Sequence, residues 1–397
     1  MAMSIRNNAW PGVPALCALA IATPPLSGVM AQTPNIRDSA GVSIVSNDPP
    51  LRAGFALAGQ PVFSACVAAA RPDPGGRSPA IAALTTDGGI LGSTTSGDWF
   101  GFDSSGHARA LVDVPLFLPR VHPGWLASDG DTVAAYVRGR LWLLDREGHV
   151  YGTRDVNARV APRTSYLDIA GVLSDGSFVL PLDAQIPSEP LESVVRHAVT
   201  LEHFAATGDS IGTFGQFWQG ETFGFLPSHD ASARLFVFYP TEQPLFAHVL
   251  FVRAAGGRVY VGDGVGFEVA IYSATGALEM IVRSRRTPRS SISAPDSVAW
   301  VSEHPDASEP ELRLRLPSLP AFSRFEVGPD GRLWVEDSHT IGDAHEWVAF
   351  GSDGRELGRL AIPVGEQVLA FGADKVLVSD AGSACGVDLR VYRITSG

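Results

Sequence analysis

Short apolar runs that follow glycine-containing turns recur along most of the chain. The first landmark is a tight turn, usually Asp-Gly, that opens a strand-like apolar segment. It occurs at residues 87–88, 129–130, 175–176, 256–257 and 330–331, and more weakly at 373–376. Asp-Gly pairs supply the positive φ angles that hairpin turns need. The pattern therefore predicts many short strands joined by tight turns.

The second landmark is a large apolar residue followed four positions later by glycine. The apolar residues are Phe102, Leu144, Phe204, Tyr272 and Phe350. Gly88 and Gly106 are 18 residues apart, as are Gly130 and Gly148. Strand-like stretches lie between and after the two landmarks, and no segment keeps a helical period for more than two turns. We therefore predict four antiparallel strands in each repeat.

Repeats of four short strands, spaced by about 40–45 residues or more, are typical of a β-propeller. We predict an all-β, six-bladed β-propeller whose blades each contain four antiparallel strands. The predicted blades lie near residues 79–114, 122–156, 166–215, 246–283, 320–363 and 364–395. Segments 216–245 and 284–319 fit no blade. We expect them to be long connections over one face, although a seventh blade is the alternative.

The last repeat lacks an outermost strand. Tyr392 takes the place of Phe102 and Phe350, but the printed sequence stops at Gly397. The apolar stretch 41–45 is not assigned to any blade. A closed ring removes the exposed sheet edges of an open array. We therefore predict that residues 41–45 form a closing strand on the sixth blade, within a single domain over residues 32–397.

Residues 1–31 have the order of a secretory signal peptide. Arg6 precedes an apolar run at 13–22, and Val29-Met30-Ala31 places a cleavage site before Gln32. The run has about ten residues, which is too short to span a bilayer. We predict a periplasmic or extracellular protein whose mature chain has no membrane span. The alternatives are an uncleaved anchor and lipid attachment at Cys17.

Export would leave two cysteines, Cys66 and Cys385. An even pair in an oxidising compartment favours a disulfide, and both cysteines lie near the predicted closure of the ring. We therefore predict a Cys66–Cys385 disulfide. Two buried free thiols are the alternative.

Composition excludes some classes of function. The net charge of −12 repels phosphate backbones, so we expect no nucleic-acid partner. Lys375 is the only lysine, and no phosphate-binding GxxxxGK[ST] loop occurs. We interpret the preference for arginine over lysine as codon composition. Hydrophobic residues make up 45% of the chain, which is enough to form a buried core.

Several motifs resemble catalytic or metal sites. Gly208-Asp-Ser-Ile-Gly212 matches G-x-S-x-G, but it falls on a predicted hairpin turn rather than a strand–turn–helix elbow. The glycine-rich stretch 262–266 lacks the helix of a dinucleotide site. One loop carries imidazoles and carboxylates, which can bind a divalent metal; the residues are Asp337, His339, Asp343 and His345. We interpret this loop as solvated, and we predict no catalytic residue, cofactor or metal.

The chain resembles secreted, six-bladed NHL-like propeller proteins of bacteria. The resemblance is carried by residues 37–45, 317–324, 327–335 and 387–394, and the last three predicted blades match best. The early blades depart from it, at residues 73–76 and 183–196. The resemblance implies the fold and no catalytic residues.

We therefore predict an exported, monomeric binding or interaction module. Its partner would be a protein, a glycan or a small molecule bound at one face of the propeller, because propeller function depends on the loops and the channel. The alternative is a calcium-dependent propeller hydrolase or lactonase with its metal in the central channel. Asp263 and Asp337 follow equivalent strands and are the acids that this alternative would use.

Overall fold

The computed structural model describes the chain in segments, all of which belong to the unit Pro34–Gly397. The described residues are 35–47, 54–67, 80–94, 99–109, 125–129, 132–137, 140–155, 171–173, 175–182, 195–222, 249–284, 320–338, 344–380 and 387–396. They form strands and turns but no helix, so none of them belongs to a helix able to cross a membrane. The predicted signal peptide, residues 1–31, lies outside these residues.

Six sheets follow one another along the chain. The first consists of β5 (Ala80–Leu84), β6 (Ile90–Thr94) and β7 (Trp99–Phe102). The second consists of β8 (Trp125–Asp129), β9 (Thr132–Val137), β10 (Arg140–Leu144) and β11 (Val150–Asp155). The third consists of β12 (Gly171–Val172), β13 (Phe178–Leu182), β14 (Val195–Phe204) and β15 (Ser210–Thr222).

The remaining sheets contain the best-matched repeats. The fourth has β16 (Phe251–Ala255), β17 (Arg258–Gly262), β18 (Glu268–Ser273) and β19 (Leu278–Ser284). The fifth has β20 (Phe322–Val327), β21 (Leu333–Asp337), β22 (Ala344–Phe350) and β23 (Glu356–Pro363). The sixth has β24 (Glu366–Phe371), β25 (Lys375–Asp380) and β26 (Val387–Ser396).

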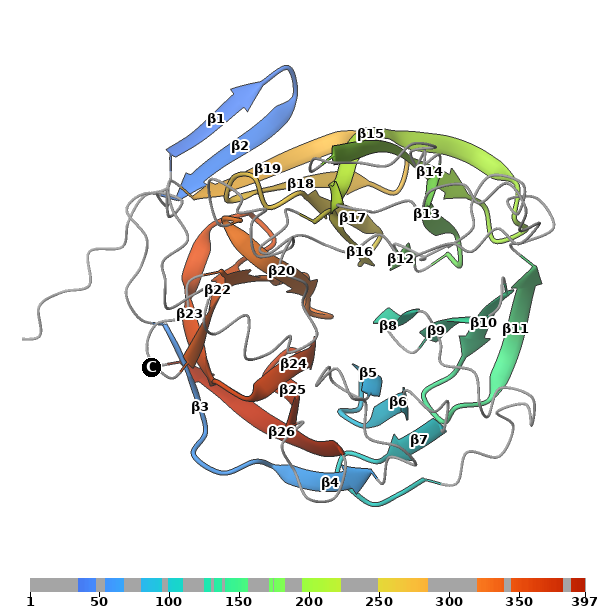
Figure 1. Cartoon of the computed structure of the whole chain (residues 1–397), viewed down its shortest axis with the longest axis vertical. Coiled ribbons are helices and arrows are strands. Elements are labelled where there is room, and N and C mark those ends of the chain that lie inside the picture. Colours follow the sequence, from blue (N-terminus) through green and yellow to red (C-terminus); the bar gives the residue numbers. More distant parts are fainter. Residues whose placement is uncertain are drawn as a thin grey trace, which may run out of the picture. The chain divides into compact units, whose positions relative to one another are not determined.

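The six sheets form a closed ring of blades (Figure 1). The first strand of each blade is innermost and contacts the first strand of the next blade, and β24 contacts β5. The predicted all-β, six-bladed propeller is therefore confirmed. Strand β16 contacts both β12 and β20, so neither of the two unassigned segments inserts a blade between blades three, four and five.

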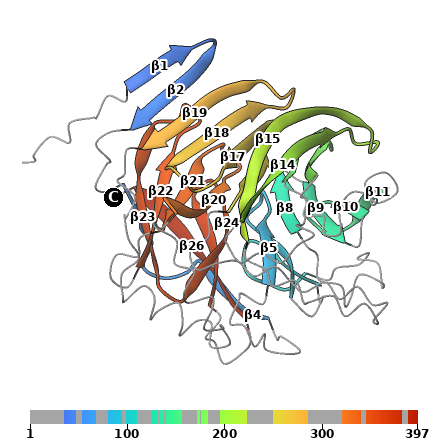
Figure 2. The same ribbon diagram turned by 45° about the horizontal axis from the view of Figure 1, so that its top comes forward.

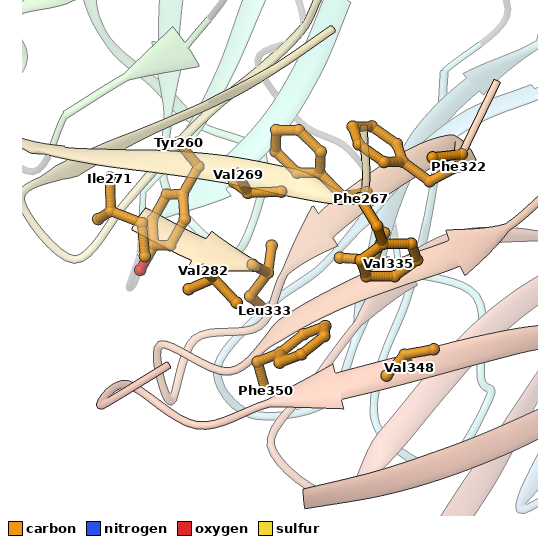
Figure 3. Close-up of a cluster of buried hydrophobic side chains, with 12 residues drawn as sticks. Tyr260, Phe267, Val269, Ile271, Val282, Phe322, Leu333, Val335, Val348 and Phe350 are labelled. Atoms are coloured by element: carbon orange, nitrogen blue, oxygen red, sulfur yellow. The ribbon is translucent and has the colours of Figure 1, made fainter. Parts of the chain in front are cut away.

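The core consists of one apolar cluster in each seam between neighbouring blades. In β21, Leu333 and Val335 pack toward blade four, whereas Trp334 packs toward blade six. This alternation follows from the two-residue period of a strand. Figure 3 shows the cluster between blades four and five, where Phe322 and Phe350 have no exposed surface. Burial in these seams holds the blades together.

The landmark glycines that the structure describes lie in the turns that the sequence predicts, whereas Gly130 lies outside the described residues. Each has a positive φ angle, which a residue with a side chain rarely adopts; they are Gly88, Gly106, Gly148, Gly176, Gly208, Gly257, Gly276, Gly331 and Gly354. In an antiparallel blade, the first-to-second and third-to-fourth turns lie at the same end. We call this end of the ring the turn face. The opposite end, where second strands end and third strands begin, is the loop face.

The closing strand differs from the expected one. Strand β26 pairs antiparallel with β4 (Phe63–Val67) and, further along, with β3 (Phe55–Leu57). The expected stretch 41–45 lies instead in β2 (Val42–Asn47), which pairs parallel with β19 in blade four. Strand β2 forms a hairpin with β1 (Asn35–Ser39), and Figure 2 shows this hairpin beside β19. Closure of the sixth blade by a strand from the N-terminal part of the chain is therefore confirmed, but the prediction that residues 41–45 form this strand was wrong.

Side-chain packing explains this choice of strand. Phe63 and Ala65 of β4 are buried in the cluster between blades six and one, so β4 carries the apolar face that closure requires. Asn47 of β2 instead fits blade five. Its Nδ2 donates to the Gly354 carbonyl at 2.9 Å, and its Oδ1 accepts from the Glu356 amide at 2.8 Å.

Candidate functional site

The motif Gly208-Asp-Ser-Ile-Gly212 is a hairpin turn, as the sequence predicts. It joins β14 to β15, and the Gly208 amide donates to the Ala205 carbonyl at 2.8 Å. Ser210 is exposed and begins β15, so it does not occupy a strand-to-helix elbow. The glycine-rich stretch 262–266 likewise joins β17 to β18. There, Asp263 Oδ1 accepts from the Val265 amide at 3.1 Å.

The structure separates two members of the candidate metal loop. His339 and Asp343 lie outside the described residues. Glu336 pairs with Trp347, which packs toward blade six. Because side chains alternate along a strand, His345 lies on this same side, while Asp337 lies on the other. The loop therefore does not bring Asp337 and His345 to one face of the blade.

A buried carboxylate, Glu336, lies beside His345 at the loop face. Glu336 is 8% exposed and lies one residue before the end of β21, on the same side of the strand as Trp334. Its Oε2 accepts from Ser323 Oγ at 2.8 Å and from Arg324 Nε at 2.9 Å. His345 Nδ1 lies 3.5 Å from its other oxygen. This carboxylate is therefore neutralised by arginine within its own blade.

Arg324 also reaches the neighbouring blade. Its Nη1 donates to the Val368 carbonyl of β24 at 2.8 Å. Its guanidinium carbon lies 5.0 Å from the ring centre of Trp347, which is a cation–π distance. Blade five thus presents a guanidinium held by a carboxylate and an indole at its seam with blade six.

Blade six supplies a second charged cluster around Arg390. Its Nη1 donates to Glu366 Oε1 at 2.8 Å, and its Nη2 donates to Asp380 Oδ2 at 2.9 Å. Both Nε and Nη2 donate to Asp388 Oδ2, at 2.9 and 2.6 Å. Burial lowers the pKa of Arg390, but the hydrogen bonds to Asp388 and Glu366 outweigh burial and raise that pKa above its ordinary value. Arg390 is therefore charged at every physiological pH.

Tyr392 extends this second cluster. Its hydroxyl donates to Glu366 Oε1 at 2.9 Å. Burial, followed by this hydrogen bond, raises the pKa of Tyr392. Tyr392 packs against the apolar cluster between blades five and six. Arg390 is two residues away on the same strand, so it lies on the same side of blade six.

The two clusters therefore line the same seam, which we call the five–six site. It consists of Arg324, Glu336, His345, Glu366, Asp380, Asp388, Arg390 and Tyr392. Counting four carboxylates and two guanidinium groups, with histidine neutral, its formal charge is −4 + 2 = −2. Some polar atoms of the seam are unpartnered. These are Glu366 Oε2 and the buried indole N–H groups of Trp334 and Trp347.

The turn face carries a different acidic group. Asp145, Glu147 and His149 bring three potential ligand atoms within 4.8 Å of one another. Asp145 Oδ1, however, accepts the amides of Glu147 and His149 at 3.0 and 2.8 Å, and Asp103 accepts those of Ser105 and His107 in the same way. The group is therefore a repeated turn in which aspartate satisfies backbone donors.

His203, Ser177 and Asp175 meet in blade three. His203 Nε2 lies 2.9 Å from Ser177 Oγ, and Ser177 Oγ donates to Asp175 Oδ1 at 2.5 Å. In a catalytic triad, serine must donate to histidine. Here the serine hydroxyl lies between the other two groups and donates to aspartate. Burial of Ser177 and His203 supports a structural role.

Sequence reasoning missed the five–six site, although a signal was present. Both faces of a propeller blade pack against neighbouring blades, so side chains on either face of an inner strand are expected to be apolar. Glu336 stands two residues after the buried Trp334, and Arg390 stands two before Tyr392. A charge at an inward position of a well-matched repeat is costly unless it is paired, so it marks a site.

Comparisons with known proteins add no argument about function. No family model matches the chain, and no curated protein matches it. A member of the DUF4221 family from Bacteroides vulgatus is 11% identical, with a TM-score of 0.45, covering 87% of this chain and 100% of that one. A putative exported protein from Bacteroides fragilis is 9% identical, with a TM-score of 0.44, covering 89% and 99%.

A calcium-binding regucalcin from Agrobacterium tumefaciens is 11% identical, with a TM-score of 0.39, and covers 85% of this chain and 96% of its own. At these identities and TM-scores, the likenesses carry no argument about function. The resemblance to NHL-like proteins therefore stays a prediction.

Proposed function

We propose that the protein is an exported binding module that holds its ligand at the five–six site. The observation that carries this proposal is the presence of two partly buried charged clusters, one from each of two neighbouring blades, at the loop-face end of one seam. Charged groups in such a place are costly unless they are paired or recognise a ligand. Convergent polar groups set between packed aromatic side chains are typical of recognition sites.

The same geometry favours binding over calcium-dependent hydrolysis. A calcium centre needs several oxygens around one point. Asp263 is engaged by a turn amide, and Asp337 points away from the side of blade five that carries Glu336. Among the described residues, one group brings three carboxylate or imidazole ligand atoms within 4.8 Å of one another. This group, Asp145, Glu147 and His149, lies on the turn face.

Thermal-shift measurements test the proposed site. Wild-type protein would be screened against dicarboxylates, polyamines, monosaccharides and short peptides. We expect one class to raise the melting temperature, and the shift to disappear in Glu336→Gln or Arg390→Gln. The control is Arg258→Gln, because Arg258 pairs with Glu279 in the turn-face half of blade four. A stabilising ligand whose effect survives in both five–six variants would contradict the proposal.

Export is tested by the mature N-terminus. The sequence predicts cleavage before Gln32. Mass spectrometry of the protein from its native host should find an N-terminal peptide that begins at Gln32, in a periplasmic or secreted fraction. An intact Met1 terminus in the cytoplasmic fraction would contradict export.

A further inference from the structure

The carboxylate of Glu366 lacks a hydrogen-bond donor. Glu366 Oε1 accepts from Arg390 Nη1 at 2.8 Å and from the Tyr392 hydroxyl at 2.9 Å. Its Oε2 has no hydrogen-bond partner among the described residues. This oxygen is buried, and the side chain as a whole is 8% exposed, so water does not readily replace the missing donor. A buried acceptor with no donor is costly, and a charged one more so. The site therefore lacks one donor beside Glu366.

The residues that the structure describes around this site do not supply that donor. Glu366, Asp380 and Asp388 carry −3, and Arg390 contributes +1, so the blade-six cluster retains a formal charge of −2. Nε, Nη1 and Nη2 of Arg390 are each engaged already. The guanidinium that blade five contributes to the same seam, that of Arg324, is held by Glu336 and the Val368 carbonyl.

From this deficit, and resting on the proposed function of the five–six site, we infer that its ligand carries an organic cation, an ammonium or guanidinium group. The cation would donate to Glu366 Oε2 and be neutralised by Asp388 and Asp380. Charge-assisted hydrogen bonds of this kind are shorter and stronger than neutral ones. The cation would supply both the missing donor and the missing positive charge.

The spacing of the carboxylates favours an organic cation over a metal ion. Asp380 and Asp388 each contact Arg390 Nη2, and Glu366 contacts Nη1, so the three acids are arranged around a planar guanidinium. Their oxygens do not form a group of three within 4.8 Å of one another. On the turn face, by contrast, the ligand atoms of Asp145, Glu147 and His149 do form such a group. A metal ion needs its ligands close around one point.

Exposure indicates the path by which a ligand enters. The side chain of Asp380 is 27% exposed, that of Asp388 is 18% exposed and that of Glu366 is 8% exposed. Asp380 ends β25 and Asp388 lies near the start of β26, so both lie at the loop face. The acids thus lead inward from solvent to the unpartnered oxygen. This gradient is suited to drawing a cation into the seam.

One of the protein's own side chains in this seam, Arg324, makes the kind of contacts that we assign to the ligand. Arg324 lies between the Glu336 carboxylate and the face of Trp347. Tyr392 places a second aromatic side chain beside Glu366. Carboxylates next to aromatic faces recognise ammonium and guanidinium groups through both charge and ring quadrupole.

Calorimetric titration with agmatine, which carries one guanidinium and one ammonium group, tests the inference. Putrescine, succinate and CaCl₂ would be titrated in parallel. We expect agmatine or putrescine to bind and succinate not to bind. Glu366→Gln should weaken binding by about tenfold or more, because it removes the charge that one strong ion pair needs. Binding should also weaken when NaCl is raised from about 50 to 500 mM.

Asp388→Asn provides a second variant if Glu366→Gln unfolds, and Glu279→Gln is the matched control outside the site. Failure of both cations to bind wild-type protein at about 10 mM would overturn the inference. So would cation binding that Glu366→Gln and Asp388→Asn leave unchanged, or CaCl₂ binding that these variants abolish. Succinate binding that Arg390→Gln abolishes would overturn the cation while preserving the five–six site as a ligand site.

Discussion

His203 is a buried titratable residue on β14. It is 7% exposed, and its Nε2 contacts Ser177 Oγ. Burial lowers the pKa of His203, and nearby Asp175 offsets this only in part. The unfolded chain has a histidine pKa of about 6.5. Protonation therefore favours the unfolded chain as the pH falls through that value.

We expect the protein to lose stability between about pH 7 and pH 5, and we expect His203→Gln to lose less over this range. The contribution of neutral His203 is fully present above the unfolded pKa and is lost as the pH falls toward the lower folded pKa. Melting temperatures across the range measure this slope. As a control, Ser177→Ala should lower the melting temperature at every pH but keep the slope. Equal slopes in wild type and His203→Gln would refute the argument.

Cys66 is disulfide-bonded. It lies on β4, opposite Asp388 of β26. Cys385 precedes Asp388 by three residues in the sequence but lies outside the described residues, so the Cys66–Cys385 bond stays a prediction. Peptide mapping without reductant should find these two cysteines linked. Linkage of Cys66 to Cys17 would contradict the pairing, and reduction should cost about 2–5 kcal/mol of stability.

At the scale of strands, β4 and the β1–β2 hairpin have different roles. Strand β4 gives blade six its outer strand and carries Phe63 into the seam with blade one. A Cβ built at Gly106 would lie 2.8 Å from the Phe63 ring, so Phe63 packs directly on a turn of blade one. The hairpin adds two strands outside β19, where blade four already has four.

We therefore expect Phe63→Ala to destabilise the protein by about 3 kcal/mol. Deletion of residues 32–47 should cost less, because β19 keeps its pairing with β18 and the ring stays closed. Urea unfolding of the two variants compares these costs. A deletion that is more damaging than Phe63→Ala would show that the hairpin, rather than β4, dominates the stability of the ring.

At the scale of the whole ring, arginines connect neighbouring blades. Carbonyl groups on the next blade accept hydrogen bonds from Arg109, Arg258, Arg324 and Arg332. Between blades four and five, both ends of the guanidinium of Arg253 donate to Glu326, at 2.9 and 2.7 Å. The arginine preference, which we interpreted as codon composition, thus also has structural consequences.

The Arg253–Glu326 pair should be a measurable connection between blades. We expect Arg253→Met to cost about 2 kcal/mol, because it leaves a largely buried carboxylate without its partner. The double variant Arg253→Met, Glu326→Leu should cost less than the sum of the single variants, by about 1 kcal/mol or more. Denaturant unfolding of the four proteins gives this coupling energy. Additive costs would mean that the pair is not coupled.

The sequence by itself determined the parts of this protein that depend on local chemistry. Asp-Gly turns need positive φ, and strands need alternating apolar residues, so the repeat and the six-bladed ring could be predicted. Both requirements act within about twenty residues, as between Gly88 and Gly106. The sequence also predicted an N-terminal strand at residues 41–45, but nothing in its local sequence indicates which blade edge this strand pairs with.

Only the tertiary structure decided which distant segments meet. Asn47 bonds to Gly354 across 307 residues, and this contact directs β2 to blades four and five instead of blade six. The five–six site likewise arises because two strand faces from different blades meet in one seam. Neither Glu336 nor Glu366 belongs to a local sequence motif, because the role of each carboxylate depends on the residues that the neighbouring blade places across the seam. Long-range packing of alternating side chains therefore created the candidate site.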